Sequence, residues 1–205
     1  TEEGYATEQY AAYHEAKAKG GYGLIITEDY RINRNAGGYK YVAGIYQDDM
    51  IEGHAKMVER VHKHGAKIFC QVYHAGRQAS ASVNGGMQIV APSPTSSPWN
   101  RDLARALTVE EIKGLVADFG TTARNVKKAG FDAVELNLDA AGAGAHSLSP
   151  ETTKAQLREI RAMSEEHGLP VHSVSSSLWG SAALGAKSAK YAARELLSIQ
   201  LELAE

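Results

Sequence analysis

The chain has 205 residues, of which 43% are hydrophobic and 22% are charged, a composition typical of a folded globular protein. The formal net charge at pH 7 is −2 and both signs are dispersed, which argues against a nucleic-acid partner. No apolar run approaches the roughly 20 residues that a membrane-spanning helix needs. We therefore expect neither a nucleic-acid partner nor a membrane partner.

Two features bear on the cellular compartment. The first residues, Thr-Glu-Glu-Gly, lack the basic and apolar regions of a signal peptide. The single cysteine, Cys70, lies in an apolar run, which excludes an intramolecular disulfide and predicts a buried thiol in a reducing compartment. We therefore expect a cytoplasmic protein.

The predicted elements alternate along the chain. Helices are predicted over residues 8–19, 48–64, 109–128, 151–167 and 187–203. Short apolar strands are predicted over residues 22–27, 68–72, 131–137 and 169–174. Thr7 is placed to cap the first helix, and Thr108-Val-Glu-Glu111 is a capping box at the start of the third. Each strand follows soon after a glycine that ends the preceding helix.

Two long segments carry no obvious helix pattern. Residues 30–49 contain Tyr30, Tyr39 and Tyr41, which would either line a substrate pocket or hold the loop in place. Residues 78–105 are rich in proline, so we expect stiff, extended backbone there and no helix.

The repeated helix–strand order predicts an α/β protein with a parallel sheet, either a (β/α) barrel or an open doubly wound sheet. No glycine-rich dinucleotide loop or P-loop follows any strand, which favours the barrel type. A full barrel has eight strands, whereas four are found here. We therefore predict one barrel-type domain over residues 1–205 that is a partial TIM barrel.

Polar side chains gather at the end of the strand at 68–72. They are Gln71, Tyr73, His74 and Arg77, and parallel α/β sheets bind ligands beyond the carboxyl ends of their strands. A buried strand followed by an ordinary polar loop explains the same pattern. Glu28, directly after the strand at 22–27, is a candidate catalytic acid or base.

Residues 1–137 resemble the old yellow enzyme family of FMN-dependent oxidoreductases. The matching pieces are Gly23-Leu-Ile-Ile-Thr-Glu28, Gly65-Ala-Lys-Ile-Phe-Cys-Gln71, His74-Ala-Gly-Arg77, Ala91-Pro-Ser-Pro94, Leu107-Thr-Val-Glu-Glu-Ile112 and Ala129-Gly-Phe-Asp-Ala-Val-Glu135. This resemblance implies FMN as cofactor and NAD(P)H as reductant.

The same resemblance assigns roles to single residues. It implies that Gln71 hydrogen-bonds the flavin ring, because an amide can both donate and accept. It places Asp29 beside the flavin, where the family usually has a small uncharged residue. His74 and Arg77 would contact the flavin edge or an anion. Asn137 stands where the family has the first residue of its substrate-binding pair, so it would be a weakened substrate contact.

Residues 129–205 resemble instead the sugar phosphate isomerase/epimerase family of xylose-isomerase-like barrels, through residues 130–139 and 157–179. That family's divalent-metal ligands have no counterpart with metal-ligand spacing here, so no metal site is predicted. The two resemblances overlap in Ala-Gly-Phe-Asp-Ala-Val-Glu-Leu. We therefore hypothesise a chimera, with a flavin-oxidoreductase-like part over 1–137 and an isomerase-like part over 138–205, or an incomplete chain.

The leading functional hypothesis is an FMN-dependent NAD(P)H oxidoreductase of the ene-reductase type, which transfers hydride to an activated alkene and takes a small-molecule substrate. One alternative is a metal-dependent sugar phosphate isomerase or epimerase. The other is a non-catalytic half barrel that self-associates through its open sheet edges, and we expect a homo-oligomer for that reason.

Overall fold

The structure is a computed structural model that describes residues 1, 3–98, 101–138, 155, 158, 162, 166 and 171–176. The chain divides into two compact units, Thr1–Asp132 and Ala133–Glu205. The prediction of a single domain over residues 1–205 stays a prediction. The elements of the first unit are α1 (Glu8–Lys19), β1 (Leu24–Arg31), β2 (Ala43–Gly44), η1 (Asp48–Met50), α2 (Ile51–His62), β3 (Lys67–Tyr73), η2 (Gly76–Gln78), β4 (Val90–Ala91), β5 (Thr95–Ser96), β6 (Leu103–Ala106) and α3 (Val109–Lys128).

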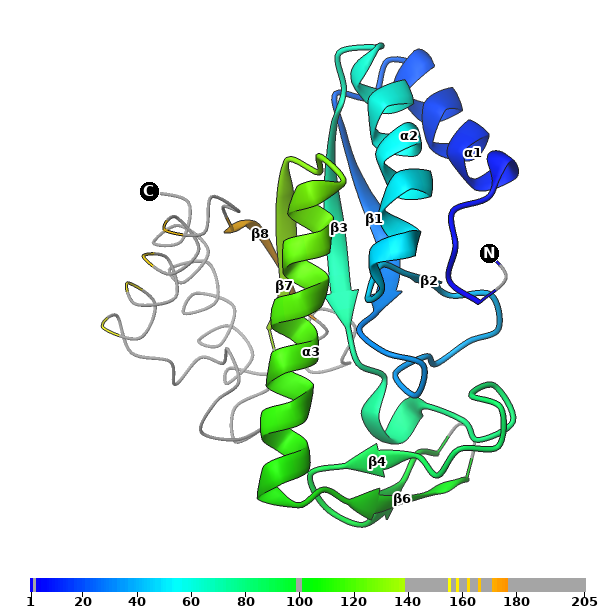
Figure 1. The fold of residues 1–205 in the computed structure, drawn as a ribbon, viewed down its shortest axis with the longest axis vertical. Helices are drawn as coiled ribbons and strands as arrows, with labels where there is room; N and C mark the ends of the chain where they lie inside the picture. The colour runs from blue at the N-terminus through cyan, green and yellow to red at the C-terminus, as the bar shows by residue number, and fades with distance from the viewer. Residues whose placement is uncertain are drawn as a thin grey trace, which may run out of the picture. The chain divides into compact units, whose positions relative to one another are not determined.

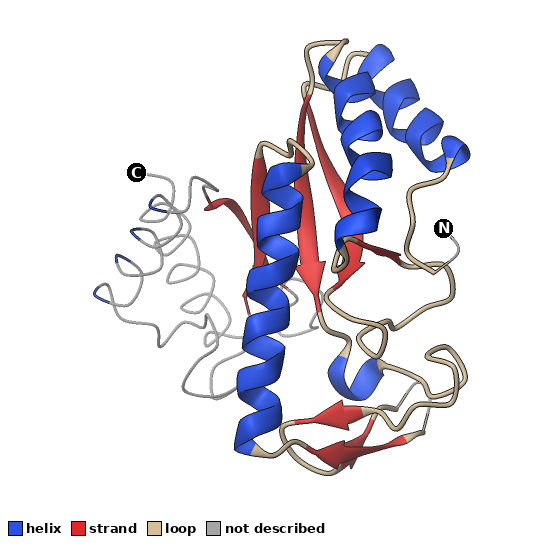
Figure 2. Cartoon of the chain, in the orientation of Figure 1, coloured by secondary structure: helices blue, strands red, loops and turns tan. Residues whose placement is uncertain are grey.

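In the first unit, β1 pairs in parallel with both β2 and β3 (Figure 1). The helices α1, α2 and α3 lie on one face of these strands. Beyond the carboxyl ends of β1 and β3 lies a small sheet in which β6 pairs with β4 and β5 (Figure 2). In the second unit, β7 (Ala133–Leu138) pairs in parallel with β8 (Val171–Ser176). The predicted barrel-type α/β architecture with parallel strands is confirmed.

Two helix starts follow the sequence signals. The Thr7 hydroxyl accepts a hydrogen bond from the Tyr10 amide at 3.2 Å and begins α1. At α3, Thr108 Oγ1 accepts from the Glu111 amide at 3.2 Å, while the Glu111 carboxylate accepts from the Thr108 amide at 2.8 Å. Both caps satisfy amides that have no partner inside the helix, so the two predicted starts are confirmed.

The loop predicted to begin at residue 30 begins later. β1 runs on to Arg31 because Tyr30 pairs with Ala43 of β2 and with Val72 of β3. The segment 78–105, predicted as extended loop, forms the three short strands of the small sheet. Both differences come from partners distant in sequence. Of the helix predicted over 151–167, residues 155, 158, 162 and 166 are described and helical, and the helix predicted over 187–203 lies outside the described residues.

A buried polar cluster lies between α1, α2 and β1. The Tyr30 hydroxyl lies 3.0 Å from His54 Nδ1, and His54 Nε2 lies 2.9 Å from the Gly44 carbonyl oxygen. A carbonyl can only accept, so Nε2 carries the proton and Nδ1 accepts from Tyr30. Tyr30, His54 and His14 are all fully buried, as is the Cys70 thiol. His54 is thus a packed core residue, and Tyr30 does not line a pocket.

His14 has fewer hydrogen bonds than His54. Its Nε2 lies 3.7 Å from the Glu28 carboxylate, too far for a hydrogen bond, and neither ring nitrogen has a hydrogen-bond partner among the described residues. Burial lowers the pKa of His14 to about 4 and that of His54 to about 4, against an ordinary value of 6.5. Both rings are therefore neutral at pH 7.

We predict that acid destabilises the first unit through these two rings. Because each pKa is lower in the folded chain than in the unfolded chain, the unfolded chain takes up protons first as the pH falls below 6.5. Between about pH 7 and about pH 5 each histidine should remove about 2 kcal/mol from the free energy of unfolding. Urea denaturation at several pH values measures this loss.

The variant His14→Phe tests the assignment. It keeps the aromatic packing against Tyr10, whose ring centroid is 4.7 Å away, and removes one group that titrates. We expect a shallower pH dependence than in the wild type. An equally steep loss of stability in the variant would contradict the assignment to His14.

Candidate functional site

The inner face of the first unit's sheet, opposite the helices, carries the predicted cofactor residues. Asp29 of β1 is in register with Gln71 of β3, and Arg31 is in register with Tyr73. Nearer the start of β1 the same face presents Leu24 and Ile26, which are 45% and 38% exposed. The exposed apolar side chains and the polar pair at the carboxyl end give this face the character of an open ligand-binding surface.

Gln71 is held in place through its backbone. Its amide donates to the hydroxyl of buried Thr27 at 3.2 Å, next to the irregularity in strand register between Ile26 and Asp29. This irregularity shifts the alternation of β1 and brings Asp29 opposite Gln71. An amide beside a carboxylate can hold a ring that has both N–H and C=O groups, but the negative charge disfavours electron uptake by such a ring.

Glu28 turns toward the helices. Its carboxylate lies beside His14 of α1, and the side chain is 50% exposed. Asp29, the next residue, lies on the inner face with Gln71. The structure therefore does not bring Glu28 together with Gln71, and a role for Glu28 as acid or base stays a prediction.

His74 and Arg77 follow β3. His74 Nδ1 accepts from the Gly76 amide at 2.9 Å, so its proton is on Nε2, which is buried and has no hydrogen-bond partner among the described residues. Burial lowers the pKa of His74, and the Asp118 carboxylate of α3 opposes this shift. Arg77 is exposed on η2. The Nε2–H is thus a buried donor that lacks an acceptor among the described residues, whereas Arg77 has no described contact that assigns it a role.

Asn137 belongs to the second unit. It lies on β7 in register with Ser175 of β8, and the structure describes its backbone alone. Its predicted role as a substrate contact stays a prediction.

A polar hollow lies at the carboxyl end of β1, and its cationic lining was not predicted. It has a volume of about 480 Å³ and is lined in part by Arg31, Arg34, Lys40 and Asn84. Tyr39 and Tyr41 also line it, in agreement with the pocket-lining alternative for these two residues. The sequence signal for this site was the pair of arginines in Arg31-Ile-Asn-Arg34, which has no distinctive spacing.

Comparison with known proteins shows the family to which this chain is related. The model of the NADH:flavin oxidoreductase / NADH oxidase family matches residues 1–142. The chain belongs to this family. Its members include proteins named NADH oxidase and NADPH dehydrogenase, and the family uses FMN and NAD(P)H.

The family relatives are longer than this chain. It is 36% identical to an NADH oxidase of Thermoanaerobacter brockii over 75% of this chain and 24% of the relative. It is 37% identical to an NADPH dehydrogenase of Listeria monocytogenes over 75% of this chain and 44% of the relative. The chain thus spans less than half the length of these two relatives.

Solved structures of family members agree in fold. The old yellow enzyme homologue from Zymomonas mobilis superposes with a TM-score of 0.66 at 26% identity, over 97% of this chain and 63% of the homologue. Morphinone reductase in complex with tetrahydroNAD gives a TM-score of 0.62 at 26% identity, over 100% of this chain and 53% of the reductase. These matches do not support an isomerase-like part over 138–205 or a chimera.

Two further observations concern the described residues alone. None of their helices is long and apolar enough to cross a membrane. Within the same part of the chain, no group of three or more His, Cys, Asp and Glu side chains is arranged to hold a metal ion.

The loop after β1 is fastened to β3 by Tyr73. The Gly38 amide donates to the Tyr73 hydroxyl at 2.8 Å, and burial raises the pKa of this hydroxyl to about 12. We predict that Tyr73→Phe, which leaves the Gly38 amide without its acceptor, lowers the free energy of unfolding by about 1 kcal/mol. It should also speed hydrogen exchange of the Gly38 amide, measured by NMR.

The matched control is Tyr39→Phe, because Tyr39 is 65% exposed on the same loop. We expect it to leave both quantities unchanged. Unchanged exchange at Gly38 in Tyr73→Phe would show that the hydroxyl does not hold this loop.

Proposed function

We propose that this chain forms part of an FMN-dependent oxidoreductase that receives electrons from NADH or NADPH. Membership of the flavin oxidoreductase family supports the reaction class. The observation that carries the proposal is the placement of Gln71 on the inner face of the sheet near the carboxyl end of β3, next to Asp29. When bound, FMN would accept hydride from the nicotinamide and pass it on.

The residues fit the flavin in part. The Gln71 amide would hydrogen-bond the polar edge of the ring, and its backbone bond to Thr27 fixes the strand that carries it. His74 Nε2–H is a second donor that has no partner among the described residues. The Asp29 carboxylate would weaken binding, most of all when the ring carries extra electrons. We therefore propose a flavin site of reduced affinity.

The finer proposal concerns the electron acceptor. We propose that the acceptor is an activated alkene and that Asn137 contacts it, as the family resemblance implies. Because the chain spans less than half of the two curated relatives above, flavin binding is a sharper test than turnover.

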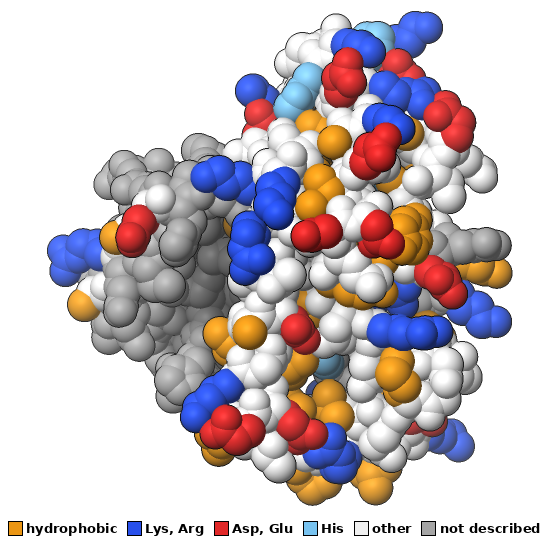
Figure 3. All heavy atoms as spheres, viewed as in Figure 1, with side chains coloured by type: hydrophobic (Ala, Val, Ile, Leu, Met, Phe, Trp, Pro, Cys, Tyr) orange, Lys and Arg blue, Asp and Glu red, His pale blue; other side chains and the backbone are white. Residues whose placement is uncertain are grey.

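A homo-oligomer would complete the open inner face with a second copy. A second surface for self-association lies on α3, on the helix side of the sheet, because Val109, Ile112, Val116 and Phe119 are exposed there at helical spacing. Figure 3 shows hydrophobic side chains at the surface of the first unit. A single sedimenting species of monomer mass over a wide concentration range would rule it out.

We predict saturable FMN binding that depends on Gln71. Titration of the purified chain should quench flavin fluorescence, and Gln71→Leu should weaken binding about ten-fold, because it removes the amide's hydrogen bonds to the ring. Gln9→Leu, an exposed position on α1, is the matched control and should bind as the wild type does. Equal affinities in all three proteins would contradict the proposed site.

We predict the opposite effect at the neighbouring position. Asp29→Ala removes a negative charge beside the flavin and restores a small residue, so FMN affinity should rise about five-fold. Asp48→Ala, which removes an exposed carboxylate at the start of η1, should leave it unchanged. Weaker binding in Asp29→Ala would show instead that this carboxylate is a hydrogen-bond partner of the flavin.

A further inference from the structure

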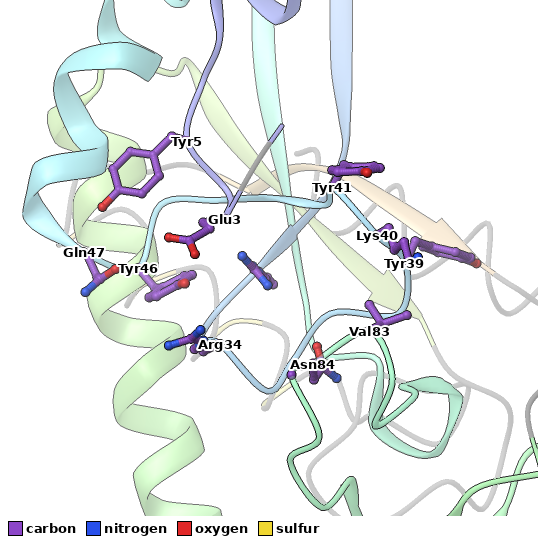
Figure 4. Close-up of a pocket in the computed structure, with 12 residues that line it drawn as sticks. Glu3, Tyr5, Arg34, Tyr39, Lys40, Tyr41, Tyr46, Gln47, Val83 and Asn84 are labelled. Atoms are coloured by element: carbon purple, nitrogen blue, oxygen red, sulfur yellow. The ribbon is translucent and has the colours of Figure 1, made fainter.

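The polar hollow differs from the Asp29–Gln71 pair in its residue types and charge, and neither Asp29 nor Gln71 lines it. Figure 4 shows its walls, which come from the N-terminal segment, the loop after β1 and the loop that carries Val83 and Asn84. All its lining residues belong to the first unit. Its volume of about 480 Å³ is in the range of small-molecule sites in proteins.

The hollow is positively charged. Arg31, Arg34 and Lys40 line it together with a single carboxylate, that of Glu3, which leaves a formal charge of +2. None of these three cations forms an ion pair with a described residue. Arg60, by contrast, pairs with two carboxylates on the outer surface. Unpaired guanidinium groups in a concave site attract an anion that offers several acceptor oxygens.

Arg31 is built into the wall of the hollow. A Cβ atom at Gly44 would lie 3.2 Å from Arg31 Cγ, and one at Gly4, where φ is +98°, would lie 3.5 Å from Arg31 Nε. Nε is buried and has no hydrogen-bond partner among the described residues. The guanidinium carbon lies 5.8 Å from the centre of the Tyr46 ring. A buried N–H without an acceptor is costly, so a bound anion would satisfy it.

Asn84 adds an acceptor to the same hollow. It is 2% exposed, and its Nδ2 donates to the carbonyl oxygens of Gly37 at 3.0 Å and Asn35 at 3.3 Å. These two bonds fix the orientation of the amide and leave Oδ1, which is buried and has no hydrogen-bond partner in the described part of the chain. A complementary ligand therefore carries a hydroxyl or N–H group as well as an anion.

Aromatic rings border the hollow. Tyr39 and Tyr41 are 65% and 69% exposed at its edge, and Tyr41 has the left-handed backbone angle φ of 65°. Such a conformation is rare for a tyrosine, and the Tyr41 carbonyl accepts a hydrogen bond from the Thr1 hydroxyl at 2.9 Å. Exposed rings next to cationic groups suit a ligand with a flat ring.

We propose that this hollow binds a phosphate-bearing ligand of the nucleotide type. The phosphate would be held by Arg31, Arg34 and Lys40, a sugar hydroxyl would donate to Asn84 Oδ1, and the base would lie against the tyrosines. The ligand is either a nucleotide, such as the phosphate-bearing half of a dinucleotide, or a smaller phosphate compound. This site does not depend on the flavin site around Gln71.

The test is calorimetric titration of the purified chain at low ionic strength with ADP and, separately, with inorganic phosphate. We expect saturable ADP binding, and Arg34→Gln/Lys40→Gln should weaken it about ten-fold or more through the loss of two cationic contacts. Both side chains are exposed, so this variant should fold. The control Lys19→Gln/Lys63→Gln removes the same charge from exposed positions outside the hollow and should bind as the wild type does.

Each outcome decides the proposal. ADP binding tighter than phosphate binding assigns the site to nucleotides, and equal affinities assign it to phosphate alone. No saturable binding of either, or equal losses in the two double variants, would overturn the site. Gln71→Leu, which alters the proposed flavin site and no residue that lines the hollow, should bind ADP as the wild type does, so a failure of the flavin proposal is distinguishable from a failure of this one.

Discussion

The hydrogen-bonded chain Tyr30–His54–Gly44 is the interaction on which the first unit depends. It joins β1, α2 and β2 through one neutral imidazole that donates on one side and accepts on the other. Because Gly44 also donates its amide to the Gly4 carbonyl oxygen at 3.0 Å, the same chain holds the N-terminal segment against β2. Protonation of His54 would remove the acceptor for Tyr30, so the fold at this point requires a ring kept neutral by burial.

This constraint links the buried face of the sheet to its functional edge. Tyr30 is held on the helix side, so its neighbours Asp29 and Arg31 face the other way, into register with Gln71 and Tyr73. The position of Gly44 in turn leaves room for the Arg31 side chain beside it. The flavin pair and the cationic hollow thus both depend on β1, and a change in the packing of Tyr30 or His54 would disturb both.

Family membership explains the architecture, whereas single residues distinguish this chain. Asp29 puts a carboxylate next to the amide expected to hold a flavin, and Arg31 puts a cation one layer nearer the carboxyl end of β1. Asp29 and Arg31 both lie on β1, two residues apart, so a negative and a positive charge occupy neighbouring positions on the same face of this strand. Replacing Asp29 and replacing the cations of the hollow should therefore have separable effects on two chemically different ligands.

The sequence by itself determined the features that depend on residues close together in the chain and on the spacing of apolar residues. Thr7 and the Thr108–Glu111 box fixed two helix starts, the apolar run ending at Gln71 predicted β3, and its polar cluster carried the family resemblance. Only the tertiary structure decided what depends on distant partners. β1 continues to Arg31 because β2 and β3 pair with it, and the hollow exists because Glu3, Arg31 and Asn84 converge from three separate segments. No local pattern encodes such a convergence, because each residue's role is set by contacts that only the folded chain creates.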